Sequence, residues 1–219
     1  QNSKKPGGPS FYVRAPKRSR EIALERAGRY LKGTLGEGII FKPCAKAEDL
    51  KINVFADAGF ASGWGTEDGS NPGSAKPRAG YIIELMGCPV IWCSKLQASI
   101  AQPAMEAGYA ALPMPLRAAA PLLGATKAIA AGLGQLAKHR LVTFKATAHE
   151  GNQGALKLAN LEEGRNTPRS KFYALRLHWL RSWLHRPSKD ISINFIEASK
   201  KKADMLAKAL PWHMCQGAG

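Results

Sequence analysis

The sequence predicts an α/β fold in which a mixed five-stranded sheet is flanked by helices. Three strand candidates follow one another between residues 50 and 94 with no helix between them, which is typical of an antiparallel meander. Two later strand candidates are separated by helical segments, which is typical of parallel crossovers. The chain has 219 residues and 45% hydrophobic content, enough to bury one core. These observations favour a single sheet-containing domain with extensions.

The first residues form a basic arm and a connector. Residues 1–20 are rich in Pro, Gly, Lys and Arg and contain no acidic residue before Glu21. This composition predicts a segment without a core of its own, which either contacts a polyanion or is simply solvated. Residues 21–32 place Leu24 and Leu31 on the apolar side of a short amphipathic helix. The expected organisation is an arm (1–20), a connector helix and linker (21–49), a domain (50–211) and a tail (212–219).

Three strands are expected in the first part of the domain. The first, residues 50–57, ends at an acidic residue and precedes a Gly-, Ser- and Pro-rich stretch at 61–78 that predicts a long loop. The second and third strands, 80–86 and 89–94, are joined tightly around Gly87, as in a β-hairpin. Together they predict three antiparallel strands.

A long helical stretch follows these strands. Residues 103–123 are dominated by Ala and Leu, which favour helix, but Pro113, Pro115 and Pro121 must kink or interrupt it. An Ala- and Gly-rich stretch to Gly134 extends this helix loosely.

The remainder alternates strands and helices. We expect a strand at 141–148, a helix at 153–161, a helix at 168–185 with Thr167 as its N-cap, a strand at 191–197 and a helix at 199–210. Several apolar side chains are expected to pack in the core: Phe172, Leu175, Trp179 and Trp183 on one helical stripe, Ile191, Ile193 and Phe195 on one strand face, and Trp92.

The charge balance identifies nucleic acid as the leading partner class. The chain has 32 Lys and Arg against 16 Asp and Glu, a net charge of +16. Basic side chains on a small domain attract polyanions. An anionic membrane surface is the competing partner, but no apolar run approaches the roughly 20 residues that span a bilayer. We expect an intracellular protein, with a mitochondrial or other organellar compartment as the more specific location.

The cysteines favour reduced structural thiols over a zinc site. The four cysteines have no paired C-x-x-C spacing, which zinc sites usually need. They are Cys44, Cys88, Cys93 and Cys215.

Acidic residues stand at positions that the predicted fold can bring together. Asp57 ends the first strand, Glu106 lies on the first helix of the domain and Asp204 lies on the last helix. A fourth acid at the end of the fourth strand would complete a set able to neutralise two Mg²⁺ ions roughly 4 Å apart. Spacing alone makes this a weak signal, because scattered acids are usually solvated.

The residues themselves carry more information. Seven segments spread over nearly everything after residue 20 are informative: ERAGRYLKGT (25–34), VFADAGFASGW (54–64), AGYIIELMGCPVIWCSKLQ (79–97), MEAGYAAL (105–112), NQGALKLAN (152–160), TPRSKFYALRLHWLR (167–181) and KADMLAKALP (202–211). Together, and in this order, they resemble the ribonuclease H domain of copia-type retrotransposon polyproteins with the short connector that precedes it.

This resemblance implies a ribonuclease H-like fold and, in intact members, hydrolysis of the RNA strand of RNA/DNA hybrids with two divalent metals. Carried over by position, Asp57, Glu106 and Asp204 resemble three of the four catalytic and metal-binding acids, here vestigial. The remaining acid normally stands immediately before Asn-Gln, and that position is Gly151. We expect no cofactor, or Mg²⁺ or Mn²⁺ if residual nuclease activity exists.

Glu150 is the candidate substitute for the missing acid. Adjacent side chains on an extended backbone point to opposite faces, so Glu150 would need a bulge or twist at the strand end to reach the metals. Other departures from the family pattern point to relaxed chemistry: Gly108 replaces a second acid, and Pro113 and Pro115 stand where a continuous helix is usual.

Three functions from different classes follow. The leading interpretation is a retroelement-derived pseudoenzyme that serves as a non-catalytic, RNA-binding structural component of a ribonucleoprotein, most specifically an organellar ribosome, in contact with RNA and neighbouring proteins. The alternatives are an active or weakly active ribonuclease H and a protein-protein scaffold in a large complex. The basic residues expected to contact phosphates are Lys4, Lys5, Arg14, Lys17, Arg18, Arg20, Arg26, Arg29, Arg165, Arg169, Lys171, Arg176, Arg181, Arg186, Lys200, Lys201 and Lys202.

Overall fold

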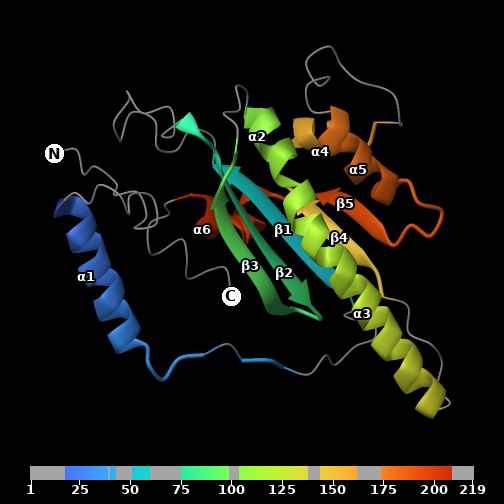
Figure 1. Ribbon diagram of the computed structural model, residues 1–219, viewed down its shortest axis with the longest axis horizontal. Helices are drawn as coiled ribbons and strands as arrows, with labels where there is room; N and C mark the ends of the chain where they lie inside the picture. Colours follow the sequence, from blue (N-terminus) through green and yellow to red (C-terminus); the bar gives the residue numbers. More distant parts are fainter. Residues whose placement is uncertain are drawn as a thin grey trace.

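A computed structural model describes residues 18–38, 40–42, 51–59, 75–98, 104–137, 144–161 and 174–208. Its centre is a five-stranded sheet in the order β3-β2-β1-β4-β5 (Figure 1). The strands are β1 (Ile52–Gly59), β2 (Arg78–Leu85), β3 (Cys88–Leu96), β4 (Ala146–Glu150) and β5 (Ile191–Phe195). β1, β2 and β3 pair antiparallel, whereas β1 with β4 and β4 with β5 pair parallel. The predicted mixed sheet is therefore confirmed.

The predicted hairpin around Gly87 is also confirmed. Leu85 pairs with Cys88, which leaves Met86 and Gly87 as a two-residue turn. Both turn residues have positive φ, 54° and 84°. This geometry matches the right-handed twist of the flanking strands, and glycine adopts it without strain.

The prolines divide the long helical stretch differently from the prediction. The structure has two helices, α2 (Ala104–Ala111) and α3 (Pro113–Ala137), with a break at Leu112. Pro113 and Pro115 lie in the first turn of α3, where a missing backbone N–H costs no helical hydrogen bond. They therefore start a helix, and only Pro121 lies inside one.

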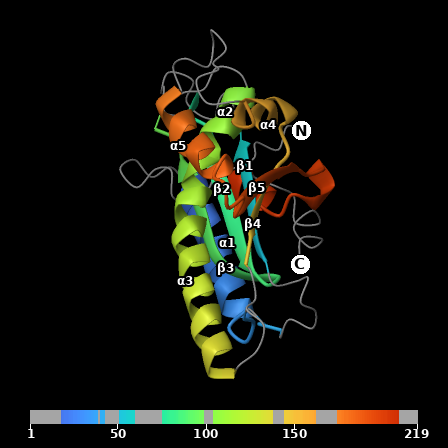
Figure 2. The same cartoon turned by 90° about the vertical axis from the view of Figure 1, so that its right-hand side faces the viewer.

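The apolar face of the sheet packs against α2 and α3. Ile52, Val54 and Ala56 of β1 share one buried cluster with Tyr109 of α2 and Leu116 of α3. Figure 2 shows α3 and α5 (Ala174–Leu184) on the same side of the sheet. Because strand side chains alternate, Asp57 lies on the other face.

A short C-terminal helix, α6 (Asp204–Ala207), packs against this second face and contacts β1, β2 and β3. Gly80, the register partner of Asp57, permits the close approach. A Cβ atom at residue 80 would lie 2.7 Å from the Leu206 backbone carbon and 2.8 Å from the Ala207 nitrogen. The sheet carries helices on both faces, and α6 is the one nearest Asp57.

Several predicted boundaries in the second half are corrected. β4 begins at Ala146 and reaches Glu150, whereas the prediction placed this strand at 141–148. The helix expected at 153–161 is α4 (Gln153–Ala159), with Asn152 as its N-cap. The helix expected at 199–210 is, within the described residues, a 3₁₀ turn (Ala198–Lys200) followed by α6. The chain turns at residues 201–203, which carries lysine side chains toward the sheet.

Two aromatic packing predictions are wrong. Phe195 is 46% exposed because it ends β5, an edge strand of the sheet. Trp92 is 56% exposed because it lies on β3, the opposite edge strand. Trp179 and Trp183 do pack against the core. The other two members of the apolar stripe predicted for this helix, Phe172 and the Leu175 side chain, lie outside the described part.

The connector helix α1 (Arg18–Gly33) begins three residues earlier than predicted. Its apolar side chains do not enter the core, and Leu24 and Leu31 are exposed. Cys88 and Cys93 are free thiols. No helix in the described ranges is long and apolar enough to cross a membrane. Most of the loop expected at 61–78, and Cys44, Cys215, Thr167 and Pro168, lie outside the described residues.

Candidate functional site

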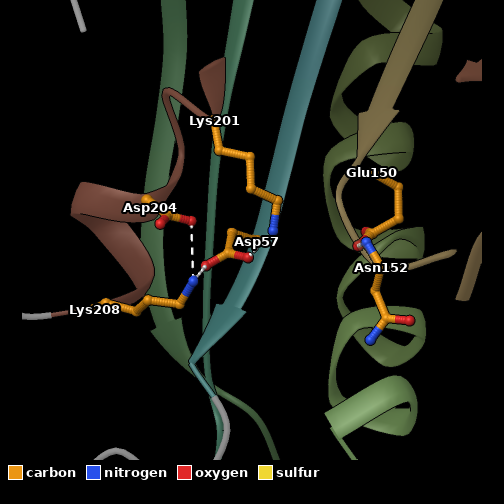
Figure 3. Close-up of polar contacts among 6 residues, drawn as sticks. All are labelled: Asp57, Glu150, Asn152, Lys201, Asp204 and Lys208. Carbon is orange, nitrogen blue, oxygen red and sulfur yellow. Dashed lines mark hydrogen bonds and ion pairs between the residues drawn. The ribbon is translucent and has the colours of Figure 1, made fainter. Parts of the chain in front are cut away.

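Asp57, near the end of β1, forms the centre of a small charged cluster. Its side chain is only 4% exposed. One carboxylate oxygen, Oδ1, accepts a hydrogen bond from Lys201 Nζ at 2.5 Å. The other oxygen, Oδ2, lies 3.0 Å from Lys208 Nζ, a contact that is an ion pair without a directed hydrogen bond. Both oxygens of Asp57 therefore face ammonium groups (Figure 3).

Asp204 joins the same cluster from the start of α6. Lys208 Nζ donates a hydrogen bond to Asp204 Oδ1 at 3.1 Å, and so Lys208 bridges the two aspartates. The sheet positions Asp57 and the close packing of α6 positions Asp204. The structure thus places these two sequence-predicted acids together.

Burial and the lysines shift the pKa values of the two aspartates in opposite directions. Burial alone would raise the pKa of Asp57, but the hydrogen bond and charge of Lys201 and the charge of Lys208 outweigh it and hold the pKa below its ordinary value. Burial, followed by the charge of Asp57, raises the pKa of Asp204. Burial opposes the charged form of Lys208, yet the charge of Asp57 raises its pKa above the ordinary value. The cluster therefore favours a charged Asp57 between two ammonium groups.

Gly151 lies on the same side of the sheet as Asp57. A Cβ atom at residue 151 would overlap Lys201 Cε and lie 2.6 Å from Lys201 Nζ. The space where a side chain of residue 151 would begin is therefore filled by Lys201. Position 151 supplies no side-chain oxygen to the cluster.

Glu150 points the other way, into the packing between the sheet and the helices, and Figure 3 shows it across β1 from Asp57. Its Oε1 accepts the backbone N–H of Asn152 at 2.9 Å, and its Oε2 is buried with no hydrogen-bond partner. A Cβ atom at Gly108 would lie 3.5 Å from Glu150 Oε1, which places the carboxyl against α2. Burial, opposed by the Asn152 hydrogen bond and by Lys201, raises the pKa of Glu150 to about 7.

The described side chains around Asp57 do not fit a divalent metal centre. A metal ion at Asp57 would have to lie where two ammonium groups already contact both oxygens, and like charges repel. Among the side chains that the structure describes, no three His, Cys, Asp or Glu residues are grouped to hold a metal ion. Glu106 lies on α2, but its side chain is outside that description.

The predicted phosphate-contacting residues divide into three groups. Arg18, Arg26, Arg29 and Lys200 are exposed, and Lys200 and Arg29 each form a surface ion pair, with Glu197 and Glu25. Lys201 and Lys202 instead pair with the buried carboxylates of Asp57 and Glu84. Lys4, Lys5, Arg14, Lys17, Arg165, Arg169, Lys171 and the side chains of Arg20 and Arg176 lie outside the described part.

Two arginines of α5 and the turn after it differ in exposure. Arg181 is 2% exposed and donates a hydrogen bond to the Leu158 carbonyl at 2.9 Å, so a surface position for it is wrong. Arg186 is exposed and stacks over the Trp183 ring, 3.6 Å from its centroid.

Sequence reasoning missed the role of Lys208 and the inward direction of Lys201. Lys208 follows Asp204 by four residues, the spacing at which helical side chains meet, and this was the available signal. The direction of Lys201 depends on the chain turn before α6, which no local pattern indicates.

Comparison with known proteins identifies relatives among retrotransposons. The chain is 32% identical over 100 residues to the retrovirus-related Pol polyprotein from transposon RE2 of Arabidopsis thaliana, and 31% identical over 100 residues to that from transposon RE1. The alignment covers 46% of this chain and about 6% of each polyprotein, so the chain spans a small part of their length. No family model matches the chain.

Solved structures with similar folds are ribonucleases H. RNase H1 from Halobacterium salinarum NRC-1 aligns with a TM-score of 0.45 and 17% identity, covering 72% of this chain and 94% of that chain. LC11-RNase H1 in complex with an RNA/DNA hybrid aligns with a TM-score of 0.43 and 16% identity, covering 71% and 92%. This chain itself has three antiparallel strands followed by two parallel ones, with helices on both faces of the sheet. By sequence, 100 residues of this chain are therefore similar to retrovirus-related Pol polyproteins from Arabidopsis thaliana transposons.

Proposed function

We propose that this chain is a non-catalytic, RNA-binding structural component of a ribonucleoprotein, with an organellar ribosome as the most specific form, built on a retroelement-derived ribonuclease H-like domain. One observation carries the non-catalytic part of this proposal. The position next to Asp57 that would supply a further carboxylate is Gly151, and a lysine side chain fills its space.

Glu150 does not take over the missing role in this proposal. Its carboxyl is buried between the sheet and α2, on the face opposite Asp57, and is held by the Asn152 backbone N–H. Reaching Asp57 would require the strand end to rotate and the carboxyl to leave this packing. Loss of an outer hydrogen-bonding partner alone typically costs 10–100-fold in metal affinity or activity, and loss of a directly coordinating carboxylate costs more.

The RNA-binding part of the proposal is supported by charge. The net charge is +16, and the basic residues exposed on α1 and after β5 are free to reach phosphates in addition to their surface ion pairs. Phosphate contacts of this kind bind without reading sequence. Lys201 and Lys202 are not part of this proposed surface, because buried carboxylates already hold them.

A hybrid-cleavage assay tests the non-catalytic part. The native chain, Gly151→Asp and the double variant Gly151→Asp with Lys201→Ala are each incubated with an RNA/DNA hybrid in Mg²⁺ and in Mn²⁺. We expect no cleavage by the native chain and none by the single variant, because Lys201 would pair with the new carboxylate. Gain of cleavage in the double variant supports the proposal. Cleavage by the native chain that Glu150→Gln abolishes would establish an active ribonuclease H instead.

RNA affinity is tested by titrating structured RNA at several salt concentrations. We expect binding that weakens steeply as salt rises, because each phosphate contact releases counterions. Replacing Arg26 and Arg29 with Gln should reduce the salt slope, whereas Lys202→Gln should not. Absence of RNA affinity, combined with salt-insensitive association with another protein, would overturn the proposal in favour of a protein-protein scaffold.

A further inference from the structure

We propose that the ammonium groups of Lys201 and Lys208 take the place of divalent metal at the Asp57–Asp204 pair, so that the cluster holds the C-terminal segment against the sheet. This inference goes beyond the proposed function and does not depend on whether the chain binds RNA.

The geometry gives each carboxylate a protein cation. Lys201 Nζ contacts Oδ1 of Asp57, and Lys208 Nζ lies between Oδ2 of Asp57 and Oδ1 of Asp204. Two carboxylates and two ammonium groups leave the cluster with no net charge. A buried carboxylate without a partner is strongly destabilising. The two ion pairs therefore offset the free-energy cost of burying the charged Asp57.

The Lys201 side chain is more buried than that of an ordinary surface lysine. Its side chain is 11% exposed, whereas that of the neighbouring Lys200 is 71% exposed. The next residue, Lys202, donates a hydrogen bond to the buried Glu84 of β2 at 2.8 Å. Of three consecutive lysines, one faces solvent and two are directed at acids on the sheet.

Gly151 and Lys201 form one coupled unit. Among the described glycines only Gly87 has a positive φ, so the backbone conformation at residue 151 does not require glycine. The end of the Lys201 side chain occupies the volume of a Cβ atom there, so a larger residue at 151 requires that flexible end to move. In this proposal a side chain at 151 shifts the Lys201 ammonium from its present contact with Asp57.

The cluster is one of three attachments of the same segment. Lys201 and Lys208 hold it to β1, Lys202 holds it to β2, and the Ser94 hydroxyl of β3 donates a hydrogen bond to the Leu206 carbonyl at 2.6 Å. The segment that carries Asp204 is therefore fixed across three strands. A site of this construction contributes to stability without a bound metal.

The first test uses the unmodified 219-residue chain and divalent metal alone. A ligand that binds only the folded state raises its unfolding temperature. We expect millimolar Mg²⁺ or Mn²⁺ to leave the unfolding temperature equal to that in NaCl of the same ionic strength. A clear rise above this control would show that metal displaces the lysines and would overturn the inference.

The second test compares neighbouring lysines by thermal unfolding. Lys201→Met keeps an unbranched side chain, shorter by the Nζ atom, and removes its charge, which leaves Asp57 with one cation. We expect its unfolding temperature to fall by several degrees, while Lys200→Met, the matched control, changes it by less than one degree. Equal effects of the two substitutions would contradict the assigned role of Lys201.

A double-mutant cycle isolates the coupling between Gly151 and Lys201. Gly151→Ala should lower the unfolding temperature in the native background, because the new Cβ atom displaces Lys201. In a Lys201→Ala background the same substitution should have little further effect. Gly124→Ala, at an open helical position, controls for the general effect of replacing glycine. If Gly151→Ala costs the same in both backgrounds, the two residues are not coupled and the inference fails.

Discussion

The Lys201 side chain occupies the space that a side chain at residue 151 would need, and from there it reaches the Asp57 carboxylate. This relationship links three segments that are distant in sequence: the end of β1, the end of β4 and the turn before α6. The following predictions test its energetic consequences and those of the packing around it.

Replacing Asp57 with Asn should strongly destabilise the protein. The substitution removes the charge but keeps the volume, so Lys201 loses its partner in a buried position. Breaking a buried pair by removing one charge typically costs about 3–5 kcal/mol. Urea unfolding of the native and variant chains measures this difference. Glu25→Gln, which breaks the exposed pair with Arg29, is the control and should cost less than about 1 kcal/mol. Similar costs for both variants would contradict the prediction.

The contribution of Asp57 should depend on acid pH. Its folded-state pKa is held below the ordinary value of 3.8 by Lys201 and Lys208, so the stabilisation is fully present above about pH 4. It should be lost as pH falls through the folded-state pKa, because protonation of Asp57 removes the attraction. The stability difference between the native chain and Asp57→Asn should therefore shrink below pH 4. A difference that stays constant down to the lowest measurable pH would rule this out.

Glu150 should have the opposite pH dependence. Its pKa is raised from 4.5 to about 7 by burial, so the folded state disfavours the charged form. The destabilisation is absent below pH 4.5, grows as pH rises, and is complete above about pH 7, where it corresponds to roughly 3 kcal/mol. Glu150→Gln should flatten the stability profile between pH 4.5 and 7. Unfolding midpoints across this range measure the effect, and parallel profiles for the two chains would be inconsistent with it.

Gly80→Ala should destabilise the attachment of α6. The added methyl group would lie 2.7 Å from backbone and Cβ atoms of Leu206, which cannot move independently of the helix. Overpacking of this kind typically costs about 1–3 kcal/mol. Gly124→Ala, at an open position of α3, should instead stabilise by about 0.5–1 kcal/mol. Denaturant midpoints of the two variants should shift in opposite directions.

Much of the fold could be predicted because local patterns carried the information. The two-residue turn at Gly87, the succession of strands and helices along the chain, and the helical composition after β3 are indicated by neighbouring residues, and the structure confirms them. The exposure of Trp92 and Phe195 could not be predicted in the same way. The alternation of apolar and polar residues indicates that the two faces of a strand differ in burial. It does not indicate that the strand lies at the edge of the sheet.

The site was only partly predictable for a related reason. The meeting of Asp57 and Asp204 follows from the resemblance, since both acids keep their places in the order of motifs. The inward direction of Lys201 and Lys202 follows from long-range partners, Asp57 and Glu84, more than 100 residues earlier in the sequence. A run of three lysines looks uniform in sequence, and only the folded surroundings distinguish its members.

The pairing of Gly151 with Lys201 also bears on how such a protein can change over time. An aspartate introduced at residue 151 by one mutation would meet the lysine and gain an ion pair, not a metal ligand. Removing the lysine first would leave the buried Asp57 short of a cation and weaken the fold. Each single step toward a metal-binding site is therefore unrewarded or harmful, and the two positions would have to change together. Under the proposed function, the packing of Lys201 against Gly151 therefore couples any later change at these two positions.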